Sequence, residues 1–482
     1  MGVSVQQTSG VGEQAGPASL GDLAAFRCAF YDCLSLRADA LFELAEAVLC
    51  ADGPVRTLVG LTLTAEHRRG HGALYDGLGS GRIQVERLRK SLAALPVPRD
   101  AHGRITLAVD VSPWLRPDAA TSPDRSFCHV YGRGKGQAQM IPGWPYSIVA
   151  ALEPGRTSWT ALLDAVRLGP CDDATTVTAT QLREVIQRLQ QAGQHKPGDA
   201  DILIVFDAGY DVTRLAFLLA DLPVELLGRL RSDRVLCSTP PPRTPTTLGR
   251  PPRHGREFKL ADPATQPEPD ALTVTDTSRY GTAQARGWNR LHPRLTHRGA
   301  WAAHDGLLPT ITGSIIRLAV QHLPGDRTPK PLWLWSSRPD LTESEMNRLW
   351  RAFLRRFDLE HTFRFLKQTL GWTRPRIRTP EQGDRWTWLI VAAHTQLRLA
   401  RHLTGDLRRP WEKPVTEPHR LTPARIRRGF RNLRPKTTLP ASAPKPTRPG
   451  PGRPPGSKNK QRASRHDVGK SSPTQNEPTH TG

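Results

Sequence analysis

The chain has 482 residues, enough for about two to four packed units, and its formal net charge of +23 favours a polyanionic partner, because each neutralised phosphate releases condensed counterions. Membrane surfaces and acidic proteins also attract such a chain, so charge favours nucleic acid without deciding for it. We expect no membrane span, signal peptide or disulfide framework, since no apolar run of about 18 residues occurs, the start is not signal-like, and the six cysteines lack regular spacing.

The first hundred residues predict a short disordered segment followed by a helical domain. Residues 1–18 are small and polar, so we expect them to be disordered. Across residues 19–100 apolar side chains recur at helical spacing, which indicates a compact domain of about four helices. The basic run at 67–71 suits phosphate contact, and a solvated face explains the same residues equally well.

The hydrophobic period changes after residue 100, and residues 101–231 predict the first part of an α/β core with a mixed sheet. The all-apolar run before Asp207 is typical of a strand buried on both faces. Strands are expected at 105–112, 145–153, 160–168, 202–209 and 224–230, and helices at 178–193 and 213–222.

Pro-rich stretches then interrupt this alternation, and residues 232–340 predict a β-rich insertion of about 100 residues. Helical periodicity returns at 341–371 and 385–403. We therefore assign residues 341–436 to the second part of the same core.

The last residues, 437–482, predict a disordered basic tail, because Pro and basic residues are frequent and apolar residues too scarce to offset chain entropy. Within this tail, residues 451–460 resemble an AT-hook. Arg453 would then lie in the minor groove and contact DNA. A generic basic linker is the alternative.

Two aspartates follow apolar strands at corresponding places. Asp110 ends the strand ITLAVD, and Asp207 ends the strand ILIVFD. Ligands of open α/β sheets bind beyond the carboxyl ends of strands, so these side chains are well placed to hold a cation together. The alternative for each is an aspartate that only caps a turn or a helix.

A third acid, Glu360, lies on the helix expected at 341–371. At about 100° per residue it shares an apolar, inward face with Arg356 and Lys367. Burying such a charge is costly unless it is paired or bound to metal. Glu360 is therefore either a metal ligand or part of a buried Glu–Arg–Lys network. Three acids on separate elements fit two Mg²⁺ or Mn²⁺ ions, with Arg356 and Lys367 left to hold phosphates.

The order and spacing of these residues resemble the DDE transposases of bacterial insertion sequences, in the branch marked by Tyr-x2-Arg-x3-Glu-x6-Lys. The chain carries Phe353-x2-Arg356-x3-Glu360-x6-Lys367, with Phe in place of Tyr, a change that does not touch the metal ligand. Asp207, followed by Ala-Gly-Tyr, is similar to the turn at the branch's second acid, and Asp110 matches the strand-borne first acid.

The resemblance implies an RNase H-like core with a β-rich insertion, a DNA-binding helical N-terminus and catalytic, metal-binding roles for Asp110, Asp207 and Glu360. The implied activity is metal-dependent cleavage and strand transfer at the ends of an insertion sequence. The implied partners are terminal inverted repeats and target DNA, engaged by a cytoplasmic, nucleoid-associated homodimer without membrane contact or small-molecule cofactor. A DNA-binding relative that no longer cuts, and a metal-dependent nuclease without strand transfer, are the alternatives.

Related enzymes stack a flipped base on an aromatic side chain, and tryptophans of the insertion are candidates for that role. These candidates are Trp288, Trp301 and Trp333, with Trp335 as a fourth. A position in the hydrophobic core is the alternative for each. Residues 289–298 are expected to form a loop facing DNA.

Overall fold

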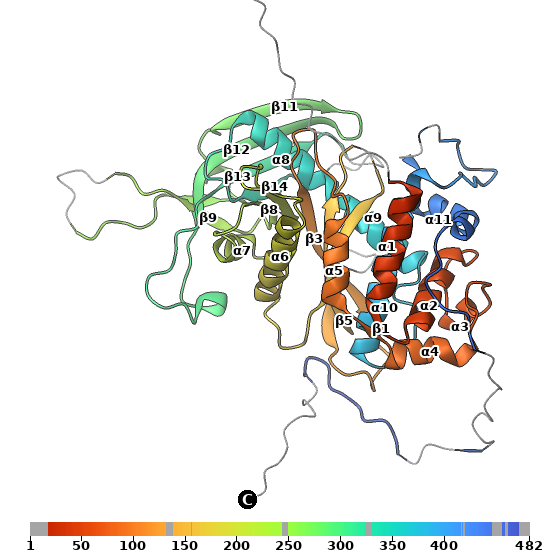
Figure 1. Ribbon diagram of the computed structural model, residues 1–482. Helices are drawn as coiled ribbons and strands as arrows, with labels where there is room; N and C mark the ends of the chain where they lie inside the picture. The colour runs from red at the N-terminus through yellow and green to blue at the C-terminus, as the bar shows by residue number, and fades with distance from the viewer. Residues whose placement is uncertain are drawn as a thin grey trace, which may run out of the picture.

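The computed structural model describes residues 18–131, 138–155, 157–242, 249–322, 329–415, 417, 420–445, 456–457 and 461–471. These residues form an α/β protein around one large mixed sheet, which confirms the α/β class and the mixed sheet that the sequence predicts. Figure 1 shows the N-terminal and C-terminal helices gathered at one end of the sheet and the β-rich insertion at the other. The expected disordered start, apart from Ala18, lies outside the described residues.

The N-terminal part is helical, as predicted, with a small two-stranded antiparallel sheet added. Its first helix begins at a capping box between Ser19 and Asp22. Its elements are α1 (Leu20–Asp32), β1 (Leu34–Leu36), α2 (Ala38–Cys50), α3 (Leu58–Leu61), α4 (His71–Ser80), β2 (Arg82–Ile83) and α5 (Val85–Ala94).

The arginines of the basic run at 67–71 are half-buried and form ion pairs within the protein. Arg68 pairs with Glu43 at 2.8 Å, and Arg69 pairs with Asp39 at 2.9 Å. Arg68 also donates to the carbonyl oxygen of Ala441 at 3.2 Å. These two arginines therefore fasten the end of the chain to α2, a role that neither phosphate contact nor a solvated face describes.

The central sheet has the strand order β6-β5-β3-β7-β8. Strands β3, β7 and β8 are parallel, whereas β5 is antiparallel to both β3 and β6. Helices α6 and α7 cover one face. The elements are β3 (Thr106–Leu115), β4 (Ser126–Tyr131), β5 (Ala138–Leu152), β6 (Thr160–Arg167), α6 (Ala174–Gln191), β7 (Ile202–Phe206), α7 (Val212–Leu218) and β8 (Val224–Leu230). The predicted strands and helices of this part are confirmed, and β4 is an addition.

The insertion is β-rich, as predicted, and it continues the central sheet instead of forming a separate layer. Strand β14 pairs antiparallel with β8, and β13, β12, β9 and β10 follow in that order, with β11 also on β12. Residues 289–293, expected in a loop, belong to β12. The elements are β9 (Val235–Ser238), β10 (Glu257–Lys259), η1 (Pro263–Thr265), β11 (Ala271–Thr277), β12 (Gly281–Pro293), η2 (Gly299–Trp301), β13 (Gly313–Val320) and β14 (Leu332–Ser336).

The helix expected at 341–371 is two helices. Helix α8 starts at a capping box formed by Thr342 and Glu345, and the helical run breaks at Arg356, which ends α8 and precedes α9. The helices of this part are α8 (Glu343–Arg355), α9 (Phe357–Gln368), α10 (Pro380–Leu399), η3 (Ala400–His402), α11 (Pro423–Leu433) and η5 (Arg434–Lys436).

The N-terminal helices share one hydrophobic core with α9, α10, α11 and a face of the sheet. Phe30 of α1, Leu41 of α2 and Trp386 of α10, all fully buried, belong to this core. Arg27 of α1 is also fully buried and hydrogen bonds to Glu46 of α2 and to Gln396 of α10. The N-terminal helices therefore do not form a separately packed domain, and the predicted domain boundary at residue 100 is wrong in this respect.

The chain remains packed after Thr437, so the predicted disordered tail is wrong for several of its described residues. Ala441 is 6 % exposed and packs in the core shared with α1 and α2. Further along, the backbone N–H of His466 donates to Ala120, and Arg125 donates to the carbonyl oxygen of His466. The AT-hook candidate Arg453 lies outside the described residues.

All six cysteines are free thiols, as predicted. Among the described residues, no helix is both long and apolar enough to cross a membrane.

Candidate active site

The pairing of β3 with β7 brings the two aspartates together. These parallel strands place Val109 opposite Phe206, so Asp110 and Asp207 follow side by side. Strand β7 ends at Phe206, as the sequence predicts, whereas β3 continues past Asp110 to Leu115, because β5 pairs with it along that length. Asp110 is therefore a residue within a strand, and the prediction that it ends one is wrong.

The alternation of side chains along the strands turns both aspartates toward α9. Ala108 and Val205, two residues before each aspartate, are buried on the face that α8, α9 and α10 cover. Glu360 lies in the first turn of α9. Three elements far apart in the sequence thus direct one carboxylate each to the same place.

Arg356 joins the three carboxylates. Its Nη1 atom lies 3.1 Å from Oδ2 of Asp110, and its Nη2 atom lies 3.3 Å from Oδ2 of Asp207 and 3.1 Å from Oε1 of Glu360. The side chain of Arg356 is 3 % exposed and stacks over the rings of Phe353 and Phe357. The predicted convergence of the acids and Arg356 is present, with the guanidinium at its centre.

Burial and repulsion from the other two acids both raise the pKa of Asp110. Burial raises the pKa of Asp110 to about 6, against the lowering effect of Arg356. The charges of Asp207 and Glu360 raise the pKa of Asp110 further. The cluster therefore lacks positive charge even with Arg356 in place.

The donor set fits hard divalent cations, which prefer carboxylate oxygens. Oδ1 of Asp207 is buried and accepts no hydrogen bond from any described residue; Nη1 of Arg229 lies 3.7 Å away. Among the described residues no three His, Cys, Asp or Glu side chains form a ready metal-binding group. At this cluster, the three carboxylates do not form such a group because Arg356 lies between the oxygens that a cation would join.

The exposure of Glu360 differs from the sequence expectation. Its side chain is 48 % exposed, whereas the nearby Thr362 is buried. The break at Arg356 changes the helical phase, so that Leu359, Thr362 and Leu366 form the buried side of α9. Glu360 is thus accessible from solvent, and the helical-wheel prediction of an inward Glu360 is wrong.

The remaining residues of the spaced motif differ in their surroundings. Phe353 is a core residue at 2 % exposure, so the absence of a hydroxyl suits its environment. Lys367 lies in the last turn of α9, with its Nζ atom 5.7 Å from the ring centroid of Trp372. Burial lowers the pKa of Lys367 to about 8, and no described acid forms an ion pair with it. Lys367 is available to an anion and is not part of the ion-pair cluster.

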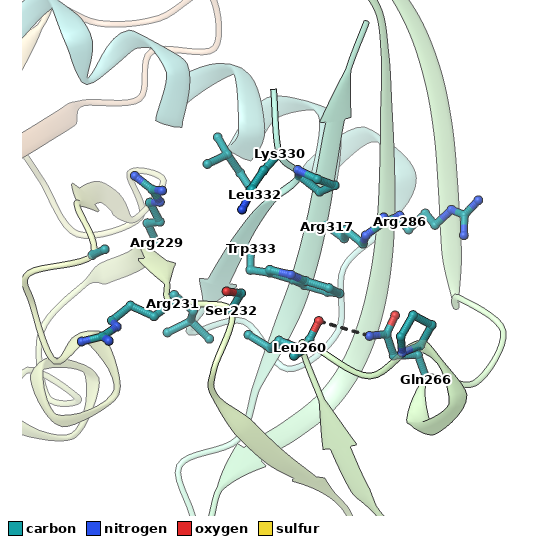
Figure 2. Close-up of a pocket in the computed structure, with 15 residues that line it drawn as sticks. Arg229, Arg231, Ser232, Leu260, Gln266, Arg286, Arg317, Lys330, Leu332 and Trp333 are labelled. Atoms are coloured by element: carbon teal, nitrogen blue, oxygen red, sulfur yellow. Dashed lines mark hydrogen bonds between the residues drawn. The ribbon is translucent and has the colours of Figure 1, made fainter. Parts of the chain in front are cut away.

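The tryptophan candidates have different environments. Trp288 is 4 % exposed, packs against Phe258 and donates its Nε1 hydrogen to the carbonyl oxygen of Pro267. Trp301 packs against Phe217 of α7. Trp333 alone of the three lines a cavity, which also reaches Ala208 beside the second aspartate (Figure 2).

Sequence reasoning missed Arg229, which lies near Asp207 from the neighbouring strand β8. One signal was present in the sequence. Arg229 is the sole basic residue of the apolar strand VELLGRL, which follows the strand that bears Asp207. A cation at that place in the next parallel strand is expected near the carboxyl end of β7.

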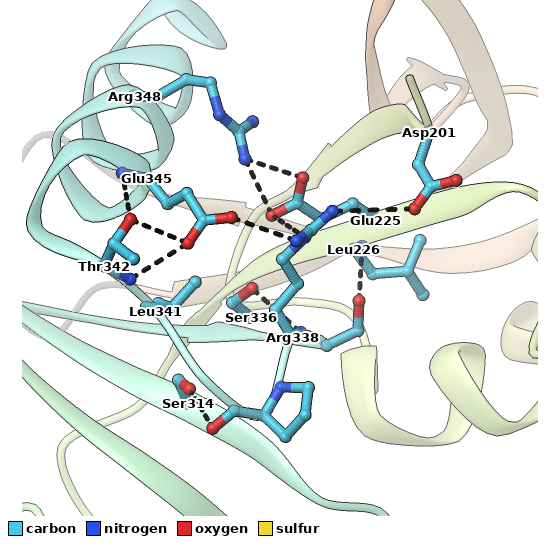
Figure 3. A network of polar contacts seen from close by, with 12 residues as sticks. Asp201, Glu225, Leu226, Ser314, Ser336, Arg338, Leu341, Thr342, Glu345 and Arg348 are labelled. Atoms are coloured by element: carbon cyan, nitrogen blue, oxygen red, sulfur yellow. Dashed lines mark hydrogen bonds and ion pairs between the residues drawn. The ribbon is translucent and has the colours of Figure 1, made fainter. Parts of the chain in front are cut away.

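A buried ion-pair network holds α8 against the sheet (Figure 3). Glu225 of β8 is 1 % exposed and pairs with Arg104 at 2.6 Å, Arg348 at 2.9 Å and Arg338 at 3.5 Å. Arg338 also pairs with Glu345 in the first turn of α8 at 3.0 Å. Because α8 leads directly into Arg356 and α9, this network fixes the helix that supplies the third carboxylate.

Three convergent carboxylates at the carboxyl edge of parallel strands are an arrangement that suits metal-dependent chemistry on phosphate esters. The comparison with known families is more specific: residues 29–294 match the model described as DDE superfamily endonuclease, and the chain belongs to this family. The match includes Asp110 and Asp207, and it includes most of the N-terminal helices that share the core. No curated protein matches the chain.

Proposed function

We propose that this DDE endonuclease is a transposase, which cleaves DNA at the ends of an insertion sequence and transfers the strand to target DNA. Family membership indicates metal-dependent DNA cleavage. The observation that carries the proposal is the meeting of Asp110, Asp207 and Glu360 at one guanidinium. The partners we propose are terminal inverted repeats and target DNA, bound by a homodimer.

The strand arrangement supports an RNase H-like core. The order β6-β5-β3-β7-β8 has three parallel strands beside an antiparallel pair, and the aspartates lie on the two central parallel strands β3 and β7. The insertion enters after β8 and returns through β14, and the helix bearing Glu360 follows it. This order agrees with the resemblance on which the sequence interpretation rests.

In the proposed mechanism Asp110, Asp207 and Glu360 would hold two Mg²⁺ or Mn²⁺ ions. Such ions, when bound, activate water or a 3′-hydroxyl and stabilise the leaving oxygen of a phosphodiester. Arg356 contacts the oxygens that the cations would occupy, so with metal bound its guanidinium would be free to bind the phosphate. Lys367, with which no described acid forms an ion pair, would neutralise phosphate charge.

The test uses DNA carrying the element's own ends, with Mg²⁺ or Mn²⁺. We expect Asp110→Asn, Asp207→Asn and Glu360→Gln to reduce cleavage by at least about 1,000-fold, because each removes a metal ligand. Asp358→Asn is the matched control, since it removes an acid from the same turn of α9 that pairs with Arg355. Full cleavage by all three variants would refute the assignment of the acids.

Strand transfer is measured separately, by adding a target plasmid to the cleavage reaction. Joined products support the transposase. Cleavage without joined products would instead support a nuclease, and DNA binding without any cleavage would support a relative that no longer cuts.

A further inference from the structure

A cavity of about 600 Å³ opens beside Ala208, on the insertion side of the candidate active site. Figure 2 shows Arg229 and Arg231 on one side of this cavity and Arg317 and Arg286 on the other, with the ring of Trp333 between them. Its described lining includes no acid. Its basic residues are Arg229, Arg231, Arg286, Arg317 and Lys330. We call this space the basic cavity.

The sheet register builds the floor of the basic cavity. Arg286 of β12 lies directly opposite Arg317 of β13, Arg317 lies opposite Trp333 of β14, and Trp333 lies opposite Leu230 of β8. Residues directly opposite each other on neighbouring strands project from the same face. Four strands therefore contribute one row of side chains, two of them arginines, and strand pairing holds the row in place.

The two arginines lack a counter-charge. Like charges directly opposite each other in a sheet destabilise it. No described acid forms an ion pair with Arg286, Arg317 or Lys330. Burial and the charge of Arg286 both lower the pKa of Arg317, whose guanidinium lies 5.8 Å from the ring centroid of Trp333. An anion in the basic cavity would relieve this repulsion.

The position of the basic cavity suggests the source of that anion. Arg229 both lines the cavity and lies 3.7 Å from Asp207. A chain of phosphates that passes the three carboxylates would therefore reach the cavity across the ends of β7 and β8. Contacts to phosphate from a positively charged groove are typical of strand binding that does not depend on sequence.

We propose that the basic cavity binds the phosphate backbone of the DNA strand that the three carboxylates engage, with Arg286 and Arg317 as its paired phosphate ligands. The inference rests on the proposed function, since that function supplies the strand. It adds a binding site in the insertion, outside the acids and outside the spaced motif of α9.

The test measures the affinity of the full chain for labelled single-stranded and duplex oligonucleotides in EDTA, where no cleavage occurs. The variant Arg286→Gln/Arg317→Gln is compared with Arg256→Gln/Arg298→Gln, which removes two exposed charges of the insertion outside the cavity. We expect the first to bind at least one oligonucleotide about 10-fold more weakly, with a salt slope reduced by about one to two, and the control to change little. Equal affinities for the two variants would overturn the proposal.

Stability gives a second readout, which a purely structural role of the arginines would move in the opposite direction. Without DNA, Arg286→Gln/Arg317→Gln should melt at or above the temperature of the wild type, because the cross-strand repulsion is removed. A lower melting temperature would contradict the argument and overturn the proposal. Inorganic pyrophosphate is the probe for a small polyphosphate ligand. If only its binding depends on the two arginines, the proposal of a DNA strand fails.

The two proposals fail in different ways. A wild-type chain that never nicks DNA with Mg²⁺ or Mn²⁺ contradicts the proposed function, whatever the affinities in EDTA. A chain that nicks DNA, but binds it equally well with and without Arg286 and Arg317, contradicts only the role of the cavity.

Discussion

In this structure the guanidinium of Arg356 occupies the place between the three carboxylates that a metal cation would take. At 3 % exposure it cannot exchange its three carboxylate partners for water without moving. A divalent ion binding Asp110, Asp207 and Glu360 would displace it. In the absence of metal, Arg356 therefore holds the three carboxylates together, and the proposed function implies that a bound metal would free it to bind phosphate.

Replacing Arg356 by Gln should destabilise the metal-free protein by about 1 to 3 kcal/mol, because three clustered carboxylates, of which Glu360 is well exposed, lose their shared cation. Mn²⁺ should restore much of this loss, since it supplies the missing charge to the same oxygens. Thermal unfolding with and without Mn²⁺ measures both effects. Arg355→Gln, one residue earlier and paired with Asp358, is the control and should show no such rescue. Equal responses of the two variants to Mn²⁺ would argue against metal binding by the cluster.

His394 of α10 predicts a second effect at the residue scale. Its ring is fully buried, neither ring nitrogen has a hydrogen-bond partner among the described residues, and burial lowers the pKa of His394 to about 3. The unfolded chain binds a proton near pH 6.5, so it holds more protons than the folded chain between pH 6.5 and 3. Stability therefore falls as pH falls through this window, by about 1.4 kcal/mol per unit.

The variant His394→Leu should remove that acid sensitivity. Relative to the wild type, it should gain about 2 kcal/mol between pH 6.5 and pH 5. Urea denaturation at several pH values measures the difference. His297→Leu, at an exposed site of the insertion, should leave the pH dependence of stability unchanged. A parallel decline of His394→Leu and wild type below pH 6.5 would refute the role of His394.

At the scale of elements, the sequence located the strands that bear the acids because their side chains are apolar and β-branched. It missed β12, whose inward positions Ala283 and Ala285 are small. Packing explains their size: a Cβ at Gly287 would lie 3.0 Å from Sδ of Met346, so α8 approaches β12 too closely for large side chains. Such closeness depends on tertiary structure, and no local pattern predicts it.

The break between α8 and α9 was missed for a similar reason. No Pro or Gly interrupts residues 343–368, so the local sequence favours one continuous helix. The break lies at Arg356, where the side chain meets carboxylates from β3 and β7. The spacing of the motif therefore singled out Arg356 and Glu360, which the structure places in contact, whereas the exposure of Glu360 depended on a contact outside the helix.

Glu225 connects the insertion, the sheet and α8, and its loss should weaken all three junctions. Glu225→Gln leaves Arg104, Arg338 and Arg348 without their buried counter-charge, so we expect a loss of about 3 kcal/mol in unfolding free energy. Urea denaturation measures the loss. Glu343→Gln, at the exposed start of α8, is the control and should change stability by less than about 0.5 kcal/mol.

Cleavage by Glu225→Gln, measured where the variant is fully folded, tests the positioning role of the network. If the network only adds stability, the cleavage rate should equal that of the wild type. If it positions α8 and α9, the rate should fall although the acids are intact.

At the scale of the whole molecule, the net charge of +23 gives the chain a general attraction to DNA that depends on salt, and the carboxylates form a small negative centre within it. The N-terminal part, residues 19–100, adds nothing to this net charge, because its ten Lys and Arg residues are balanced by ten Asp and Glu residues, and its helices pack as part of the core. Composition and charge favoured nucleic acid as the partner, and the family comparison indicates DNA. They could not show that the first hundred residues and α10 bury their side chains together.

That shared core leads to a prediction about truncation. A variant beginning at residue 101 would expose the faces of α10 and α11 that pack against α1 and α2, and Gln396 would lose Arg27. We expect this variant to be insoluble or to lack a cooperative melting transition, because a contiguous buried core is removed. Residues 18–100 alone should also fail to melt cooperatively. Two separate cooperative transitions, one for each fragment, would show instead that the N-terminal helices form an independent DNA-binding domain.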